Sequence, residues 1–241
     1  MIVFPDNWKE IGQGLPSIPL QKIENTILEI LSEIPCASLA FSGGVDSCLL
    51  LYYLQKVKKQ VVAFTMGKTL DHPDVVYSKI AIENIGGNVR HEIYIPNKED
   101  IETQGEGNVY GIFYEYVSKF TNRMISGDGI DEFMCGYYPH QKNPTESEYY
   151  YFLSRLVPDH LIPLNRESGD VKVYLPYIDR RLILLMAQIP IWDKVDKENR
   201  KKIIMSLAKN KLPSAILERW KHGFCDALNV KEKRWVKEAP A

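Results

Sequence analysis

The first third of the chain alternates between helical and strand-like patterns of hydrophobic residues. Segment 22–34 carries apolar side chains three and four positions apart, which predicts an amphipathic helix that ends at Pro35. The short apolar run 37–41 predicts a buried strand, and the leucine-rich segment 47–57 predicts a helix after two glycines. The β-branched segment 60–66 predicts a second strand. The order strand, helix, strand is typical of a parallel sheet.

The alternation continues through a further helix and strand and then changes. Segment 72–87 predicts a helix that closes at two glycines, and segment 88–96 predicts a strand that stops at a proline. A helix around 109–120 and a strand at 122–126 form a third unit. From about residue 140, prolines interrupt short helical segments. We therefore predict an α/β fold, an open parallel sheet flanked by helices, with a mostly helical C-terminal portion.

The composition limits the class of protein. The chain has 241 residues, of which 45% are hydrophobic and 25% charged, as in an ordinary globular domain. The formal net charge is -1, so the chain carries no excess charge that would attract nucleic acid or an anionic membrane. It shows no signal-peptide pattern and no apolar run of membrane-spanning length, which predicts a cytoplasmic location. The composition leaves the oligomeric state open, a homo-oligomer included.

Cysteine and histidine residues form no metal-binding pattern. The 4 cysteines and 5 histidines are scattered, without a C-x-x-C pair or a histidine spaced to complete a zinc site. We expect the cysteines to be free and mostly buried thiols.

The sequence SGGVDS lies between the first predicted strand and the helix that follows. Backbone N–H groups at such a junction point outward beside the positive end of the helix dipole, which creates an anion site. The hydroxyl groups of Ser42 and Ser47 add hydrogen-bond donors. Gly43 and Gly44 leave room for phosphate oxygens to approach the backbone. The pattern predicts a phosphate-binding loop.

This loop lacks the lysine that neutralises the phosphates in another type of phosphate-binding loop. The chain contains no G-x-x-x-x-G-K-[ST] segment, whose lysine neutralises the terminal phosphates of a bound nucleotide. Asp46 lies within the loop instead. A divalent cation such as Mg²⁺, which prefers carboxylate and phosphate oxygens, is therefore expected to neutralise a bound polyphosphate.

A second glycine-bearing turn, SGDGIDEFMCGYY, follows the predicted strand at 122–126. Asp128, Asp131 and Glu132 lie close together there and repel one another unless a cation compensates them. Acidic residues are also favoured at a helix N-terminus, which would explain them without a ligand. Since open parallel sheets bind ligands at the carboxyl ends of their strands, we expect the two turns to meet in one crevice.

Four segments in matching order resemble one family. SGGVDS resembles the pyrophosphatase loop of the ATP pyrophosphatase (PP-loop) superfamily, whose members cleave ATP between the α and β phosphates. SGDGIDEFMCGY resembles the S-G-[DE]-G-x-D-E-x-x-x-G-Y segment of asparagine synthetases and the related β-lactam-forming synthetases. Segment 173–190 resembles their R-x-P-F-L-D segment, with Asp179 as a helix cap. Segment 200–224 resembles their closing helix, its Leu-Pro break and the K-x-G-F stretch.

The resemblance implies an adenine nucleotide alpha-hydrolase-like fold and a division of the chain. Residues 1–20 would be an N-terminal extension, 21–140 the PP-loop nucleotide-binding core, and 141–241 a helical portion that completes the same synthetase domain. The implied activity is that of an ATP-dependent, AMP-forming amide ligase. It would adenylate a carboxylate, aspartate or a related amino acid, release pyrophosphate and transfer ammonia or another amine.

The resemblance also implies roles for individual residues, with ATP and Mg²⁺ as cofactors. Asp128 would bind the substrate ammonium group or assist deprotonation of the amine, and Lys221 would place a cation on the α phosphate or on an oxyanion. Asp128 is one methylene shorter than the glutamate of many relatives, so the reach toward the substrate differs. The other implied contacts are Ser42, Gly43, Gly44 and Ser47 with pyrophosphate, Asp46 and Asp131 with Mg²⁺, Ala63, Phe64 and Thr65 with adenine, Gly127 with the nucleotide, and Ser126 and Glu132 with the substrate.

The source of the amine and the exact class of enzyme stay open. Residue 2 is Ile, whereas a glutaminase domain of this family carries its nucleophilic cysteine there, and the predicted sheet begins near residue 37. We therefore expect no glutaminase domain. The nitrogen would come from free ammonia, from a separate glutaminase subunit or from another amine. Small-molecule carboxylates and amines are the expected partners, and neither a membrane nor nucleic acid is favoured. The alternatives are a different PP-loop synthetase, β-lactam synthetase-like or nucleoside- or tRNA-modifying, and a non-catalytic ATP-binding subunit.

Overall fold

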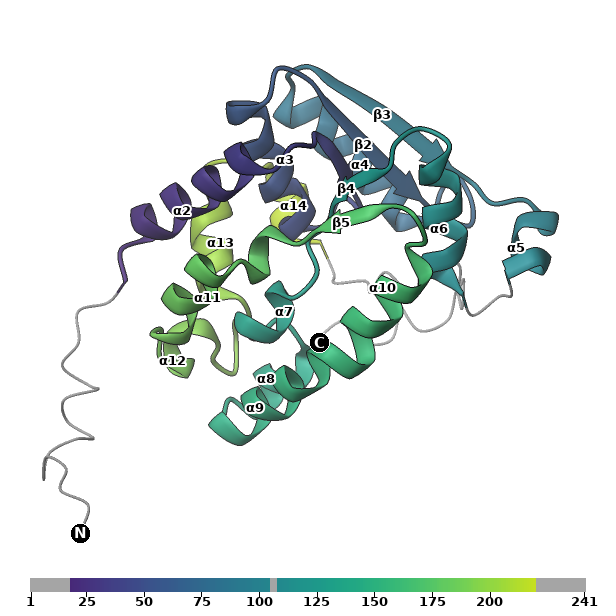
Figure 1. Ribbon diagram of the computed structural model, residues 1–241. Coiled ribbons are helices and arrows are strands. Elements are labelled where there is room, and N and C mark those ends of the chain that lie inside the picture. The colour runs from purple at the N-terminus through teal and green to yellow at the C-terminus, as the bar shows by residue number, and fades with distance from the viewer. Residues whose placement is uncertain (1–17, 105–107, 220–241) are drawn as a thin grey trace, which may run out of the picture.

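The computed structural model describes residues 18–104 and 108–219 and begins with alternating helices and strands (Figure 1). The predicted elements up to β4 are confirmed, with bounds that differ by a few residues. A short helix after β3 was not predicted. The elements are α2 (Leu20–Glu33), β1 (Ser38–Ala40), α3 (Val45–Val57), β2 (Val61–Met66), α4 (Pro73–Ile85), β3 (Val89–Tyr94), the unpredicted α5 (Lys98–Gln104), α6 (Val109–Ser118) and β4 (Arg123–Ile125).

The second half is mostly helical, as predicted, but it also adds a strand to the sheet. The elements are α7 (Ile130–Phe133), α8 (Tyr138–Lys142), α9 (Glu146–Arg155), the π-helix η1 (Leu156–Leu161), α10 (Ile162–Glu167), β5 (Lys172–Tyr174), the 3-10 helix η2 (Pro176–Ile178), α11 (Arg180–Ala187), α12 (Ile191–Lys194), α13 (Lys202–Ala208) and α14 (Ser214–Leu217). The proline-punctuated sequence explains why these helices are short, since proline removes a helical N–H donor.

The sheet has five parallel strands in the order β3-β2-β1-β4-β5. The chain moves outward from β1 through β2 to β3 and then returns to the other side of β1 with β4. Leu39 of β1 pairs with Ile125 of β4, so these two neighbouring strands end at the same edge. The predicted open parallel sheet is confirmed, and the reversal of strand order beside β1 is where such sheets form a ligand crevice.

Successive residues of β2 face opposite sides of the sheet and bury two hydrophobic clusters. Val61 and Ala63 pack in the larger cluster with α2 and α3, whereas Phe64 and Met66 pack in a second cluster with α6. A strand covered on both faces reads as a continuous apolar run, which is the pattern of segment 60–66. The helices that flank the sheet in Figure 1 therefore close both of its faces.

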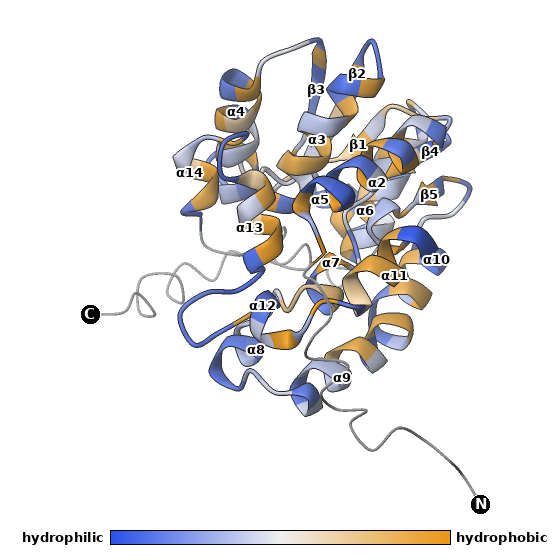
Figure 2. Ribbon diagram, turned by 90° about the vertical axis from the view of Figure 1, so that its left-hand side faces the viewer, coloured by the Kyte–Doolittle hydropathy of each residue, from blue (hydrophilic) through white to orange (hydrophobic). Residues whose placement is uncertain are grey.

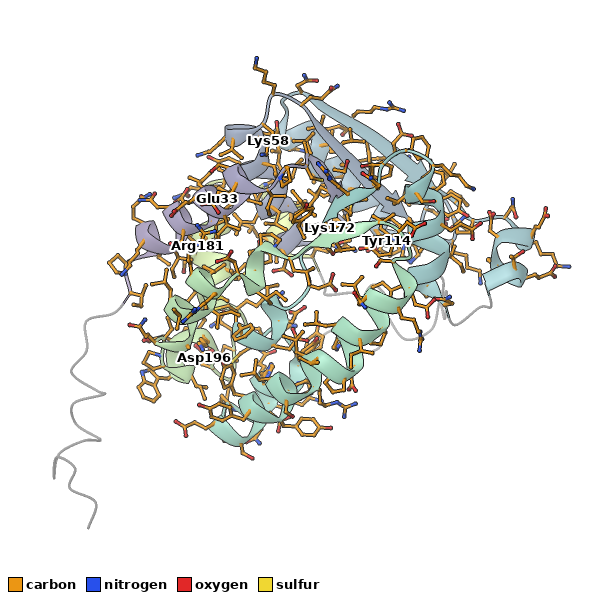
Figure 3. All side chains as sticks on the ribbon, viewed as in Figure 1. Glu33, Lys58, Tyr114, Lys172, Arg181 and Asp196 are labelled. Carbon is orange, nitrogen blue, oxygen red and sulfur yellow. The ribbon has the colours of Figure 1, made fainter. Side chains whose placement is uncertain are left out.

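The C-terminal helices attach to the core through an ionic junction as well as apolar packing. Asp179 caps α11, as predicted, because its Oδ1 accepts a hydrogen bond from the Arg181 backbone N–H at 2.9 Å. The Arg181 guanidinium lies 2.8 Å from Glu33 at the end of α2, and Figure 3 labels both side chains. The hydrogen bond from Arg181 lowers the pKa of Glu33. Within 18–104 and 108–219, none of the helices combines the length and the apolar character of a membrane span.

Candidate functional site

Both glycine-bearing turns leave the same edge of the sheet and line one cavity of about 750 Å³. The first turn follows β1 and the second follows β4, its neighbour. The C-terminal elements α13 and α14 pack against α3, as Figure 1 shows. Residues of both helices line another part of the cavity. The cavity is lined by most of the sequence-predicted site residues, namely Ser42, Gly44, Asp46, Ser47, Phe64, Ser126, Gly127, Asp128, Asp131 and Glu132.

The first turn is built by the two serines around the N-terminus of α3. The Ser42 hydroxyl oxygen accepts a hydrogen bond from the Gly44 backbone N–H at 3.3 Å, and the Ser47 hydroxyl donates to the Gly44 carbonyl at 3.1 Å. Gly44 is the N-cap residue of the 13-residue helix α3. The first N–H groups of a helix have no partner within it, so this turn presents backbone donors and a positive helix end to the cavity.

Positions 43 and 44 of this turn favour glycine for different structural reasons. Gly43 has a positive φ of 71°, and a Cβ there would lie 2.3 Å from the Ser78 backbone nitrogen on α4. Gly43 is therefore required for the approach of α4, and it does not line the cavity. A Cβ at Gly44 would meet only the Ser42 hydroxyl at 3.3 Å and the Arg219 guanidinium at 3.9 Å. Only Gly44 fits the expectation of a glycine that keeps the cavity side open.

Asp46 and Asp131, one from each turn, lie on either side of one ammonium group. Lys201 Nζ lies 2.5 Å from Asp46 Oδ2 and 2.6 Å from Asp131 Oδ1. Lys201 directly precedes α13 in a hydrophilic loop between α12 and α13, which Figure 2 shows in blue. Burial lowers the pKa of Lys201, but the two carboxylates outweigh it and hold that pKa above its ordinary value. The two turns are thus adjacent and favour a cation between them.

Gly136 makes this arrangement possible. A Cβ at position 136 would lie 1.8 Å from Asp131 Oδ1 and 2.2 Å from Lys201 Cε. The Gly136 carbonyl accepts a hydrogen bond from Arg200 at 2.7 Å, which ties the second turn to the loop that carries Lys201. Gly136 therefore leaves the space that the ion cluster of Asp131 and Lys201 occupies.

Arg219 links the first turn to α4. Its guanidinium donates to the Ser42 carbonyl at 2.6 Å and forms a buried ion pair with Asp74 in the first turn of α4. Both side chains of the pair are only 4% exposed. The ion pair fixes the end of β1 relative to α4. Arg219, far along the chain, therefore holds the first glycine-bearing turn in place.

The other end of the cavity carries acidic and phenolic groups. The Ser126 hydroxyl donates to Asp128 Oδ2 at 2.5 Å, and the Tyr137 hydroxyl donates to Glu132 Oε1 at 2.6 Å. Burial raises the pKa of Asp128 and of Glu132, and the Ser126 and Tyr137 hydrogen bonds only partly offset it. His160 Nε2 lies 3.7 Å from the same Glu132 oxygen. Tyr114 of α6, labelled in Figure 3, also lines this cavity.

Some sequence-predicted contacts are not brought to the cavity. Ala63 and Thr65 are buried in β2 away from it, whereas their neighbour Phe64 lines it. The Thr65 hydroxyl donates to the Phe41 carbonyl at 2.6 Å and lies 2.9 Å from His91 Nε2, a contact that connects three strand segments. Burial lowers the pKa of His91 to about 4, so that ring is neutral and part of the sheet. Lys221 lies outside the described residues.

Sequence reasoning missed four residues that shape the site. Lys201 stands in a run of basic residues with no pattern of its own, and Arg219 and His160 are isolated charged or titratable residues in helical segments. Gly136 was part of the matched segment but had no role there. These residues are Gly136, His160, Lys201 and Arg219.

The donor atoms at the junction of the two turns fit a magnesium ion that also binds phosphate. Among the residues that the structure describes, no group of three or more His, Cys, Asp and Glu side chains is placed to hold a metal. Asp46 and Asp131 nevertheless converge on one cation, and Asp46 Oδ1 has no hydrogen-bond partner within the described residues. Mg²⁺ is commonly bound by one or two carboxylates together with water and substrate phosphates.

The site thus defines an open α/β protein whose ligand crevice lies at the reversal of strand order, with a glycine turn and paired carboxylates at the carboxyl ends of the strands. The model of the asparagine synthase family matches residues 31–106 and 147–239, which is most of the chain. The chain therefore belongs to the asparagine synthase family, and its resemblance to that PP-loop family is confirmed.

Individual relatives are distant. The chain is 24% identical over 225 residues to a probable glutamine-hydrolysing asparagine synthetase of Acanthamoeba polyphaga mimivirus, and the match covers 81% of this chain and 40% of that protein. The chain thus spans well under half the length of this relative. Among solved structures, the NMN synthetase of Francisella tularensis is similar with a TM-score of 0.49 and 14% identity, over 87% of this chain and 78% of that one.

Proposed function

We propose that this protein is an ATP-dependent, AMP-forming amide ligase of the asparagine synthetase type. The observation that supports it is the convergence of Asp46 and Asp131 on one cation beside the N-terminus of α3. Helix N-terminal donors suit a pyrophosphate group, and paired carboxylates suit the Mg²⁺ that accompanies it. Family membership supports the same reaction.

The phosphate end of the cavity would bind ATP. The Gly44 backbone and the hydroxyls of Ser42 and Ser47 would contact the β and γ phosphates, with Gly43 acting through the shape of the turn. Asp46 and Asp131 would hold Mg²⁺, whose charge neutralises the phosphates when it is bound. In the structure, Lys201 supplies the positive charge between these carboxylates that Mg²⁺ would supply when it is bound. Phe64 would lie along the adenine, and Lys221 is proposed to act on the α phosphate as the family resemblance implies.

The acidic end of the cavity would bind the acyl substrate. Asp128 and Glu132 would hold the ammonium group of aspartate or a related amino acid, with Ser126 fixing the Asp128 carboxylate. Gly127 lies between these residues and Asp46, since a Cβ there would be 3.9 Å from Asp46 Cβ. The substrate carboxylate would thus face the α phosphate. Its oxygen attacks phosphorus, the bond to the bridging oxygen breaks, and pyrophosphate leaves with that electron pair.

The amine step would complete the reaction. The amine attacks the acyl carbon, AMP leaves with the electron pair of the carbon–oxygen bond, and an amide forms. Ammonia, either free or from a separate glutaminase subunit, is the proposed nitrogen donor.

The test is a pyrophosphate-release screen with ATP and Mg²⁺ across amino acids, with ammonium chloride as the amine. We expect release with one acid or a few related ones, and a loss of at least about 100-fold in Asp46→Asn and Asp131→Asn, since each removes a metal ligand. Asp159→Asn, on the exposed side of η1, is the matched control. ATP binding without pyrophosphate release for any acid would instead favour the non-catalytic ATP-binding subunit.

A further inference from the structure

His160 enters the acidic end of the cavity from an unusual helical turn. It belongs to η1, the π-helix between α9 and α10, where the Ile162 backbone N–H bonds to the Val157 carbonyl five residues back. Figure 1 shows α9 beside α7, which carries Glu132. Pro163 lacks an N–H donor, which removes the bond that would otherwise continue an α-helical ladder here. Single π-helical turns within helices are frequent at functional sites.

The contacts of His160 leave part of its ring available. Nε2 lies 3.7 Å from Glu132 Oε1, and Tyr137 donates to that oxygen at 2.6 Å. The His160 side chain is 37% exposed and lines the cavity, whereas the Glu132 side chain is 3% exposed. Among the described residues, the His160 imidazole has no partner within hydrogen-bond distance, since even Glu132 Oε1 is 3.7 Å away. Glu132 thus faces one ring nitrogen and leaves Nδ1 without a protein partner in this part of the chain.

We propose that His160 is the general base of the amine step, an assignment that rests on the proposed function. The nitrogen that attacks the acyl-adenylate carries one proton more than the amide product retains. As the carbon–nitrogen bond forms and AMP leaves with the carbon–oxygen electron pair, that proton moves to the imidazole. Glu132 orients the ring and stabilises the imidazolium that results, as a carboxylate does for a catalytic histidine.

Other groups at this end are less suited to accept the proton. Burial raises the pKa of Tyr137, and Lys201 is held in its charged form by two carboxylates. Asp128 accepts the Ser126 hydrogen bond and is assigned to the substrate ammonium. Imidazole changes charge near neutral pH, which matches the requirement for a general base.

The charged groups around His160 come from several elements. Glu132 faces it from α7, and Asp128 influences the same region from the loop after β4. Asp131 lies beside Glu132 but contacts Lys201. On its own element, Asp159 is paired with Arg155 at 2.5 Å in an exposed position. A proton that moves to the His160 ring therefore arrives beside the Glu132 carboxylate.

The experiment separates the two half-reactions in the wild type, His160→Gln, His160→Asn and the control Asp159→Asn. ATP–pyrophosphate exchange with the acid found in the screen reports adenylation, and amide formation with ammonium chloride reports the amine step. We expect exchange to be retained in both His160 variants while amide formation falls by about 100-fold, the ordinary contribution of a general base. The rate of amide formation should fall toward acidic pH in the wild type and in Asp159→Asn. The residual activity of the His160 variants should show no such fall.

Chemical rescue gives a readout that a structural role would not produce. His160→Gly should regain amide formation when free imidazole is added, and the wild type should not respond. Amide formation that is unchanged in the variants, or a parallel loss of exchange and amide formation without rescue, would overturn the assignment of His160. A wild type that releases no pyrophosphate with any acid would refute the proposed function itself, so the two failures are distinguishable.

Discussion

Lys201 places its ammonium nitrogen 2.5 Å from Asp46 Oδ2, although the two residues are 155 positions apart in the chain. Asp46 lies in the first turn of α3, whereas Lys201 directly precedes α13. The contact is buried on the lysine side, where only 7% of the side chain is exposed. The C-terminal portion of the chain thus completes a charge cluster that begins in the turn after the first strand.

Gly136→Ala should disrupt this cluster. The new Cβ would overlap Asp131 Oδ1 and Lys201 Cε, so one of them must move, at a cost of about 1 to 3 kcal/mol of unfolding free energy. Magnesium-dependent pyrophosphate release should fall with it. Denaturant unfolding and the release assay measure the two effects. Gly169→Ala is the control, because it has a positive φ of 55° but no neighbour within 4 Å, so it should lose stability without losing activity.

Gly43→Ala and Gly44→Ala should separate folding from nucleotide binding. At Gly43, a left-handed backbone and a clash with α4 together cost about 3 kcal/mol, so this variant should unfold readily. At Gly44, the Cβ meets only the Ser42 hydroxyl and Arg219, and the loss should be about 1 kcal/mol. ATP affinity, measured by calorimetry, should fall in the folded Gly44→Ala variant. Equal stability of the two variants would contradict the packing role of Gly43.

The buried pair of Arg219 and Asp74 should show strong coupling in a double-mutant cycle. Arg219→Met leaves a carboxylate buried without its guanidinium, and we expect a loss of about 3 to 5 kcal/mol. Arg219→Met combined with Asp74→Leu should recover part of that loss, because no buried charge remains. Urea unfolding of the four proteins measures the coupling. Strictly additive losses would show that Arg219 and Asp74 are not energetically coupled.

Asp128→Asn should stabilise the ligand-free protein at neutral pH. Burial raises the pKa of Asp128 from its ordinary 3.8, so the folded state binds this proton more tightly than the unfolded state does. Stability contributed by the protonated group is therefore present below the ordinary value and is lost as pH rises through the raised one. The asparagine side chain can still accept the Ser126 hydrogen bond, but it has no proton to lose and so causes no loss of stability as pH rises.

The measurement compares unfolding free energies of the wild type and Asp128→Asn at several pH values. The gain from the substitution should grow from about pH 4 toward neutrality. A constant difference across this range would contradict a raised pKa for Asp128.

Local patterns were sufficient for the elements that depend on short-range sequence. Segment 60–66 reads as one apolar run because both of its faces are covered, and the glycines of each turn mark a strand followed by a helix. Asp179 was predicted as a cap because that contact reaches only two residues along the chain. β5 was missed because, unlike the equally short β1 and β4, it is not followed by a glycine-bearing turn, and because its position depends on pairing with β4.

The sequence by itself determined the parallel sheet, its two adjacent glycine turns and the carboxylates that follow them. Only the tertiary structure decided which distant residues complete the site: Lys201 between two aspartates, Arg219 behind the first turn and His160 beside Glu132. The physical reason is that periodicity and turn chemistry act between near neighbours in the chain. Charge pairing and steric exclusion depend on which segments the fold brings together.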